Sequence, residues 1–196
     1  MSLVDLIAQA DDRGLAASGL ACLDRCVPLL GGDDETFRPL WGSLAEDPPG
    51  DWGKRLDEAR GALEPTASDG HDAAAAGDAG DAEEEAVRLA RRMLDAAPAD
   101  RCAPQVRAWA DACSVAALQI HRLLDPAGPE ADVDSGRAGR TEDLPPLVAA
   151  ELRRQITVLE LIAGHGAAGL RQALEVSTEG RRVLRAVVSR RARGCG

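Results

Sequence analysis

The sequence predicts an all-α protein, a helical bundle of roughly five to six helices joined by long loops rich in Pro, Gly and Asp. Hydrophobic residues make up 45% of the 196 residues, but aromatic residues make up only 2%. Alanine supplies much of the remainder, and alanine has the highest helix propensity of all residues. The residues that favour strands are scarce and scattered. Apolar residues recur at spacings of three and four, the helical period.

An N-terminal helical segment is expected over residues 2–64. Ser2 is a good helix cap, and an apolar stripe that begins at Leu3 extends to about Cys26. The stripe predicts either one helix or two short helices that bend near residues 11–14. Pro28 and the glycines at 31–32 then end it. A short amphipathic helix is expected at residues 54–64.

Residues 31–53 are expected to form an irregular loop, because Pro and Gly are frequent there. Three of the four aromatic residues, Phe37, Trp41 and Trp52, lie in this stretch. Each can bury ~150–250 Å², so the simpler interpretation is that they anchor the loop on the helices. The alternative is that they are exposed and bind a partner, which makes them candidate interaction residues.

Residues 65–82 are predicted to form an acidic low-complexity linker, since they have no large apolar side chain to bury. A C-terminal helical bundle is expected over residues 83–193. Its helices should begin near residues 83, 104, 144 and 167, with a loop at 126–143. The last of them is expected to be unbroken or to break near residues 177–180.

Charge is separated along the chain, which carries a formal net charge of −10. Residues 64–85 contain eight acidic residues and no basic one, whereas residues 181–193 contain six arginines and no acidic residue. Such separated blocks are typical of interaction surfaces or solvated segments. The net charge argues against a nucleic-acid-binding protein that acts through its whole surface. Because Lys54 is the only lysine, the arginine content by itself indicates a GC-rich genome rather than a function.

The sequence predicts a cytoplasmic protein. No segment approaches the ~18–20 apolar residues that a membrane span requires, and the first residues lack the basic region and cleavage site of a signal peptide. The five cysteines are an odd number, which favours reduced thiols over a disulfide framework.

No complete catalytic, cofactor or metal-binding motif is present, and we expect neither a metal nor a cofactor. Cys22 and Cys26 share a helix face, but a metal site would need two further ligands. Cys113 and His121 are too far apart on one helix to act as a nucleophile and its base, about 12 Å at 1.5 Å per residue. Trp109, Cys113 and His121 remain the candidate lining of a pocket.

The arginine run predicts a basic amphipathic helix, with Arg181, Arg182 and Arg185 as candidate interaction residues. The simpler interpretation is a final bundle helix whose arginines face water. The alternative is an electrostatic contact with an acidic partner. A further hypothesis is a weak intramolecular contact in which the acidic stretch 78–85 masks the arginine run, at ~0–1 kcal/mol for each exposed pair.

Two classes of function follow. The first is a non-enzymatic helical protein-interaction or regulatory protein with an unidentified protein partner, or one that forms a homodimer; nucleic acid is not the expected partner. The second is a helical small-ligand-binding protein or enzyme with a pocket near Trp109, Cys113 and His121. The first is preferred, because the chain has long charged segments and no recognisable cluster of polar residues that converge on one site.

Overall fold

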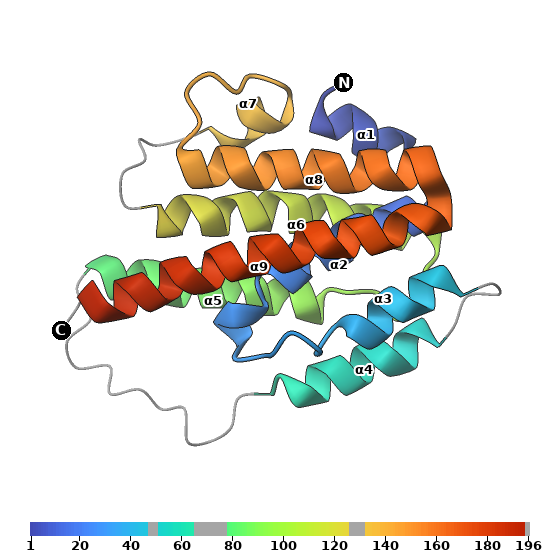
Figure 1. Cartoon of the computed structure of the whole chain (residues 1–196), viewed down its shortest axis with the longest axis horizontal. Coiled ribbons are helices and arrows are strands. Elements are labelled where there is room, and N and C mark those ends of the chain that lie inside the picture. Colours follow the sequence, from blue (N-terminus) through green and yellow to red (C-terminus); the bar gives the residue numbers. More distant parts are fainter. Residues whose placement is uncertain (47–50, 65–77, 126–131, 195–196) are drawn as a thin grey trace.

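The computed structural model describes residues 1–46, 51–64, 78–125 and 132–194, and this part of the chain is all-α, as predicted (Figure 1). The described residues form nine α-helices and two short 3₁₀ helices, more than the five to six helices expected, and no strand. The elements in chain order are α1 (Leu3–Gln9), α2 (Asp12–Arg25), η1 (Val27–Leu30), α3 (Arg38–Ala45), α4 (Trp52–Ala62), α5 (Asp78–Asp95), α6 (Ala103–Leu124), α7 (Val133–Arg137), α8 (Pro146–His165), η2 (Gly166–Ala168) and α9 (Gly169–Gly194).

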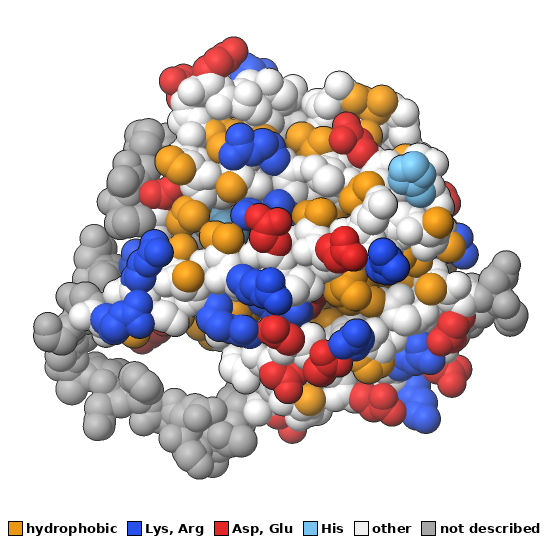
Figure 2. All heavy atoms as spheres, viewed as in Figure 1, with side chains coloured by type: hydrophobic (Ala, Val, Ile, Leu, Met, Phe, Trp, Pro, Cys, Tyr) orange, Lys and Arg blue, Asp and Glu red, His pale blue; other side chains and the backbone are white. Residues whose placement is uncertain are grey.

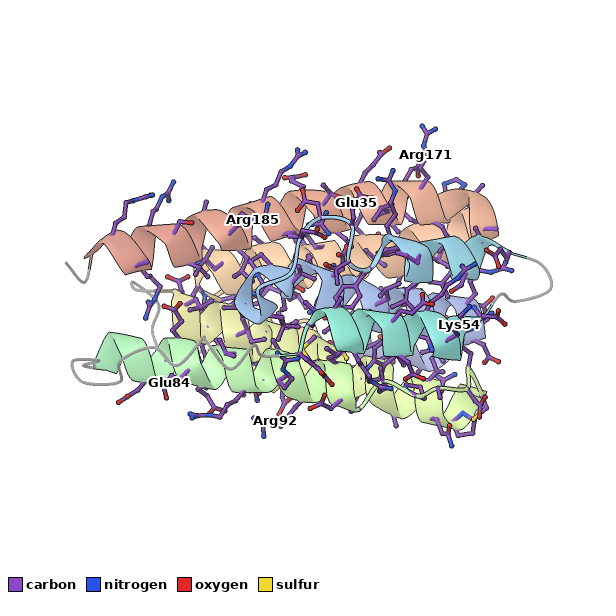
Figure 3. The ribbon with its side chains drawn as sticks, turned by 90° about the horizontal axis from the view of Figure 1, so that it is seen from below. Glu35, Lys54, Glu84, Arg92, Arg171 and Arg185 are labelled. Carbon is purple, nitrogen blue, oxygen red and sulfur yellow. The ribbon has the colours of Figure 1, made fainter. Side chains whose placement is uncertain are left out.

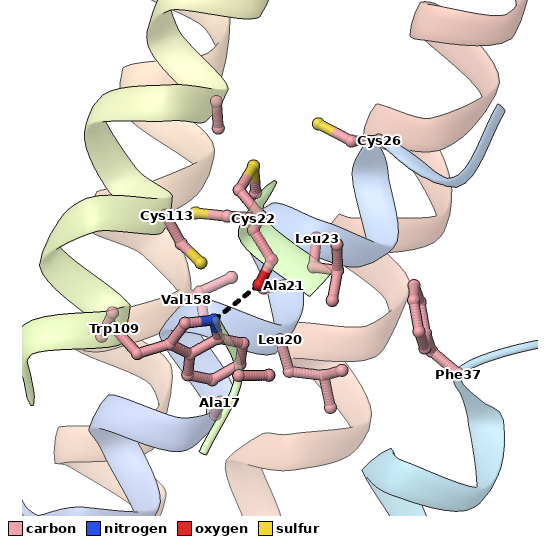
Figure 4. Packing of buried hydrophobic residues seen from close by; sticks show 14 of the residues in the cluster. Ala17, Leu20, Ala21, Cys22, Leu23, Cys26, Phe37, Trp109, Cys113 and Val158 are labelled. Carbon is pink, nitrogen blue, oxygen red and sulfur yellow. Dashed lines mark hydrogen bonds between the residues drawn. The ribbon is translucent and has the colours of Figure 1, made fainter. Parts of the chain in front are cut away.

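Helix α2 lies at the centre of the bundle and contacts α5, α6, α8 and α9 (Figures 1 and 3). Every residue from Gly14 to Arg25 is buried. Small residues on α2 permit this close packing: a Cβ atom at Gly19 would lie within 3.0 Å of three atoms of the Trp109 indole. The apolar residues of all nine helices join in one hydrophobic cluster, part of which Figure 4 shows.

The first helical pattern divides into two helices, one of the two forms expected. Asp11 lies between the two helices and caps the start of α2, because its carboxylate accepts a hydrogen bond from the Gly14 amide at 2.7 Å. Ser2 and Asp5 cap α1 reciprocally.

The expectation of an irregular loop over residues 31–53 is wrong for part of that range. Residues 38–45 form α3, with Pro39 in its first turn, where a missing amide proton is harmless. Leu40, Trp41 and Leu44 are buried on one face of α3. The apolar spacing of this short segment therefore outweighs its Pro and Gly content.

Two other helix limits differ from expectation, and α9 takes one of its two expected forms. Helix α5 begins at Asp78 rather than near residue 83, and most of the predicted linker, residues 65–77, lies outside the described part. The predicted loop at 126–143 contains the short helix α7, while residues 126–131 are also outside. Helix α9 is continuous through Gly180. Among the described helices, none has the length and apolar character that crossing a bilayer requires.

Candidate functional site

A buried ion pair joins the last turn of α2 to α8. Arg25 donates hydrogen bonds to both oxygens of the Glu151 carboxylate, from Nε to Oε2 at 2.8 Å and from Nη2 to Oε1 at 2.5 Å, and both side chains are 0% exposed. Burial acts to raise the pKa of Glu151, but the charge of Arg25 and the hydrogen bonds from Arg25 and Gln155 hold that pKa below its ordinary value. Glu151 therefore carries its negative charge inside the bundle.

A chain of hydrogen bonds leads from this ion pair to the surface. Gln155 donates to Glu151 at 3.0 Å and accepts a hydrogen bond from Ser114 of α6 at 2.7 Å. Arg137 of α7 donates to the Ser114 hydroxyl at 3.1 Å and forms an ion pair with the half-exposed Asp111. The short helix α7 is thus tied to α6 and, through Ser114, to α8.

His121 completes the buried network. Its Nδ1 lies 2.7 Å from the Ala117 carbonyl oxygen, so this nitrogen carries a proton and donates it. Its Nε2 has no hydrogen-bond partner and lies 3.7 Å from a Glu151 oxygen. Burial lowers the pKa of His121, against the raising effect of Glu151. The neutral imidazole is therefore favoured in the folded protein.

The candidate pocket residues of α6 belong to the packed core. Trp109 is 4% exposed, and Cys113 and His121 are 0% exposed. The Trp109 indole donates to the Met93 carbonyl at 2.9 Å, the bond drawn in Figure 4. Burial raises the pKa of the Cys113 thiol well above its ordinary value. The two clefts described below are lined by other residues.

Cys22 and Cys26 also lie in the core beside Arg25. Burial raises the pKa of Cys22 to about 12, so the sulfur is a thiol rather than the thiolate that binds metals. In the part of the chain that the structure describes, no group of three or more His, Cys, Asp or Glu side chains is placed to hold a metal ion. Cys195 lies outside that part.

Among the arginines of α9, Arg181 is buried, Arg191 is half-buried and the others are exposed. Arg181 is only 3% exposed, contacting Asp24 at 2.5 Å and Asp34 at 3.1 Å, so it does not lie on the solvent-facing side. Arg185 donates to the same Asp34 carboxylate at 2.8 Å. We use the term arginine face for four exposed residues in the C-terminal half of α9: Arg182, Arg185, Arg190 and Arg193. Figure 2 shows Lys and Arg side chains over this part of α9, and Figure 3 labels Arg185.

A small cleft of about 280 Å³ separates the N-terminal part of the arginine face from the segment that leads into α3. Asp34, Arg181 and Arg182 are among the residues that line it. The hydrogen bond from Arg185 and the neighbouring arginines lower the pKa of Asp34. Asp34 thus stays ionised and contacts two arginines of α9.

The three aromatic residues of the 31–53 region are buried, which confirms that they anchor this region on the helices. Phe37, Trp41 and Trp52 are 0%, 4% and 3% exposed. The Trp41 indole donates to Asp24 at 3.3 Å, and Trp52 packs edge-on against Trp109 with ring centroids 6.1 Å apart. In this conformation they offer a partner almost no apolar surface.

The predicted contact between the acidic stretch and the arginine run is wrong for Glu84 and Glu85. Glu84 pairs with Arg88, and Glu85 pairs with Arg88 and Arg92, all within α5. Helices α5 and α9 lie on opposite sides of the bundle (Figure 3). Among the described residues, the acid that pairs with the arginine face is Asp34, which is close to α9 in the fold but not in the sequence.

The sequence interpretation missed Arg25 and Glu151. A signal was present, because Arg25 continues the i, i+4 series of Ala17 and Ala21 on an otherwise apolar stripe. Glu151 likewise precedes Leu152 in the apolar stripe of α8. A charged residue of each sign at a core position of two different helices indicates a buried ion pair.

Comparison of the chain with protein-family models, with curated protein sequences and with solved structures finds no match. A function must therefore be argued from these residues.

Proposed function

We propose that the chain is a non-enzymatic helical protein-interaction protein whose arginine face binds an acidic segment of a protein partner. One observation carries the proposal: Asp34 of the same chain already contacts Arg185 and the adjacent Arg181. An aspartate or glutamate of a partner would make the same charge-assisted hydrogen bonds. Arg182, Arg190 and Arg193 extend the basic surface along α9, which suits an extended acidic segment.

The contact of Asp34 with Arg185 is weak enough to be displaced. Arg185 and Asp34 are 44% and 43% exposed at their side chains. Exposed ion pairs of this kind contribute only ~0–1 kcal/mol and are screened at physiological salt. Asp34 would therefore reduce the affinity of the arginine face for a partner without blocking it, and this competition is the basis for a regulatory role.

The burial of the reactive side chains supports the non-enzymatic part of the proposal. Glu151, His121 and Cys113 are all 0% exposed, and a substrate cannot contact them without opening the bundle. The alternative, a pocket near Trp109, Cys113 and His121, has no supporting observation, because protein side chains fill that region.

The proposal is tested with a fluorescein-labelled peptide of alternating Glu and Ala, followed by fluorescence anisotropy at low and physiological salt. The test variant is Arg182→Gln/Arg185→Gln/Arg190→Gln. The matched control, Arg88→Gln/Arg92→Gln/Arg122→Gln, removes the same charge from exposed positions outside the arginine face. The test variant should bind up to about tenfold more weakly at low salt, since it removes three exposed ion pairs that contribute ~0–1 kcal/mol each and about 1.4 kcal/mol is a factor of ten. The control should bind like the wild type.

Three results would contradict the proposal. The first is no binding of the peptide to the wild type at low salt, and the second is equal weakening by the test and control variants. The third is tighter binding of a single-stranded DNA of the same charge than of the peptide, which would make nucleic acid the better partner.

A further inference from the structure

A second, wider cleft lies at the end of the bundle where α2 and α4 begin. Its volume is about 930 Å³, and three short segments line it: residues 11–13, residues 51–54 and residues 99–101. The last segment connects α5 to α6. None of these residues takes part in the arginine face or in the buried ion network.

Trp52 and Gly53 fix the walls of this cleft. The Trp52 indole donates to the Pro98 carbonyl at 2.8 Å, which joins the start of α4 to the α5–α6 connection. Gly53 allows a close approach, because a Cβ atom there would lie 3.0 Å from the Ala99 carbonyl oxygen. The cleft is thus built on helix ends that are held together, which is how binding sites keep their geometry.

Two arginines line this cleft, and neither is hydrogen-bonded to one of its acids. Within the described residues, neither Arg13 nor Arg101 makes a hydrogen bond or an ion pair within 4.0 Å. Burial and the charge of Arg13 lower the pKa of Arg101, against the raising effect of Asp12. Two guanidinium groups at one site present several donors that a carboxylate can accept from together.

Acidic residues also line the cleft, and they limit which ligand charges it can accept. Asp11, Asp12, Asp51 and Asp100 stand against the cations Arg13, Lys54 and Arg101, a formal balance of four acids to three bases. Asp11 is occupied as the cap of α2 and Lys54 is paired with Glu58, which leaves three acids and two arginines in the lining. The carboxylates would repel a free anion, and the arginines would repel a free cation. A molecule that carries one charge of each sign satisfies both sets.

We propose that this cleft binds a small zwitterion of the amino-acid class, either a free amino acid or a short peptide with free ends. Its carboxylate accepts hydrogen bonds from Arg13 and Arg101, and its ammonium group contacts aspartates of the same lining. The cleft volume is within the range of about 300–1,000 Å³ that small-molecule sites occupy.

The only lysine of the chain, Lys54, lies in this cleft and provides the reporter. Reductive methylation with ¹³C-formaldehyde keeps its charge and gives one dimethyl-lysine NMR signal, besides that of the N-terminal amine. The labelled protein is titrated with each of the twenty standard amino acids and with glycylglycine. Acetate and methylamine, each of which carries one of the two charges, serve as half-probes.

At least one zwitterion should shift the Lys54 signal in a saturable manner. Arg13→Gln and Arg101→Gln should each weaken that binding roughly tenfold or more, whereas Arg122→Gln, at the opposite end of α6, should not change it. Circular dichroism of each variant establishes that it is folded. Both cleft variants should bind the acidic peptide like the wild type, so this inference and the proposed function fail separately.

Each other outcome overturns the inference. A panel in which no zwitterion gives a saturable shift excludes the amino-acid class. An unchanged affinity in the Arg13→Gln/Arg101→Gln variant means that these arginines do not hold the carboxylate. Acetate or methylamine binding as tightly as every zwitterion means a simple anion or cation site.

Discussion

Arg25 and Glu151 carry opposite charges into a part of the bundle that water does not reach. Removing two charges from water costs several kcal/mol for each ion, and a buried pair recovers this cost only when its geometry is good and its remaining polar atoms are satisfied. Here the contact is bidentate, and Gln155 donates a further hydrogen bond to Glu151. The pair requires α2 and α8 to take one relative position, which an apolar contact would leave less defined.

Glu151→Gln should lower the free energy of unfolding by about 3–5 kcal/mol, because it leaves the Arg25 charge buried and unpaired. Urea denaturation followed by circular dichroism measures this change. Glu160→Gln on the exposed side of the same helix is the control and should change the free energy by less than about 0.5 kcal/mol. The double variant Arg25→Met/Glu151→Leu should be more stable than Glu151→Gln; if it is less stable, the pair stabilises the fold more than this reasoning allows.

His121 makes the stability depend on pH in a predictable direction. Burial lowers its pKa in the folded protein below the ordinary value of 6.5, despite the raising effect of Glu151. The unfolded chain therefore binds a proton that the folded protein resists, and stability is lost as pH falls through 6.5. The loss should reach at most about 1.4 kcal/mol at pH 5.5, one unit below the unfolded pKa.

Urea denaturation at pH 8.0 and pH 5.5 tests this effect in the wild type and in His121→Gln. The difference in unfolding free energy between the two pH values should be smaller in the variant, whatever its absolute stability. An equal difference in both proteins would assign the pH dependence to other groups.

At the scale of the helix, α9 continues through Gly180, where a break was one of the expectations, and the reason for a glycine at this position is packing. A Cβ atom at residue 180 would overlap the Arg25 side chain and lie 3.0 Å from Cδ of Arg154. The glycine therefore serves packing, since α9 lies directly against the arginine that α2 sends to Glu151. A glycine in the middle of a helix destabilises that helix relative to alanine, and the packing of α9 on α2 and α8 offsets this loss.

Gly180→Ala should destabilise the protein by about 1–3 kcal/mol, because overpacking displaces a fixed side chain. Gly61→Ala in α4 is the matched control: a Cβ atom added at Gly61 would meet nothing within 4 Å, so alanine should stabilise by up to about 1 kcal/mol through helix propensity. Thermal denaturation of both variants shows the two signs. A stabilising Gly180→Ala would mean that Arg25 moves aside easily.

The helical class and most helix positions were predictable, because apolar periodicity and Ala content are local properties of the sequence. Helix α3 was not, since Pro39 and the nearby glycines resemble a loop until Leu40, Trp41 and Leu44 are known to be buried. The contact of Asp34 with Arg185 was also beyond a sequence argument. It joins residues 151 positions apart, and only the packing of α9 against the segment before α3 brings them together.

At the scale of the whole molecule, the fold keeps the acidic stretch and the arginine run apart, whereas the sequence suggested a contact between them. The arginine run and the acidic stretch lie on different sides of the bundle, and α5 neutralises part of its acidic stretch with its own Arg88 and Arg92. The two charged segments are therefore separated in the fold as well as along the sequence. Among the described residues, Asp34 is the acid that forms an ion pair with the arginine face.

The connection between α4 and α5 sets a limit on how far the chain can be shortened. Arg91 of α5 donates to the Leu63 carbonyl at 2.7 Å, which places the end of α4 beside the later turns of α5. Thirteen residues separate Asp78 from Arg91, or about 20 Å along the helix at 1.5 Å per residue. Because an extended residue spans at most ~3.6 Å, about six residues are needed to connect the end of α4 to the start of α5 over that distance.

Deletion of residues 66–71 leaves more than this number and removes no large apolar side chain. It should leave the free energy of unfolding unchanged, or raise it by up to about 0.6 kcal/mol, since a shorter connection loses less entropy on closing. Deletion of residues 66–77 leaves too few residues and should destabilise the protein by pulling the first turns of α5 apart. Urea denaturation of both deletions measures the difference. If the shorter deletion is as destabilising as the longer one, residues 66–71 contribute contacts of their own; if both are neutral, the start of α5 is not needed for stability.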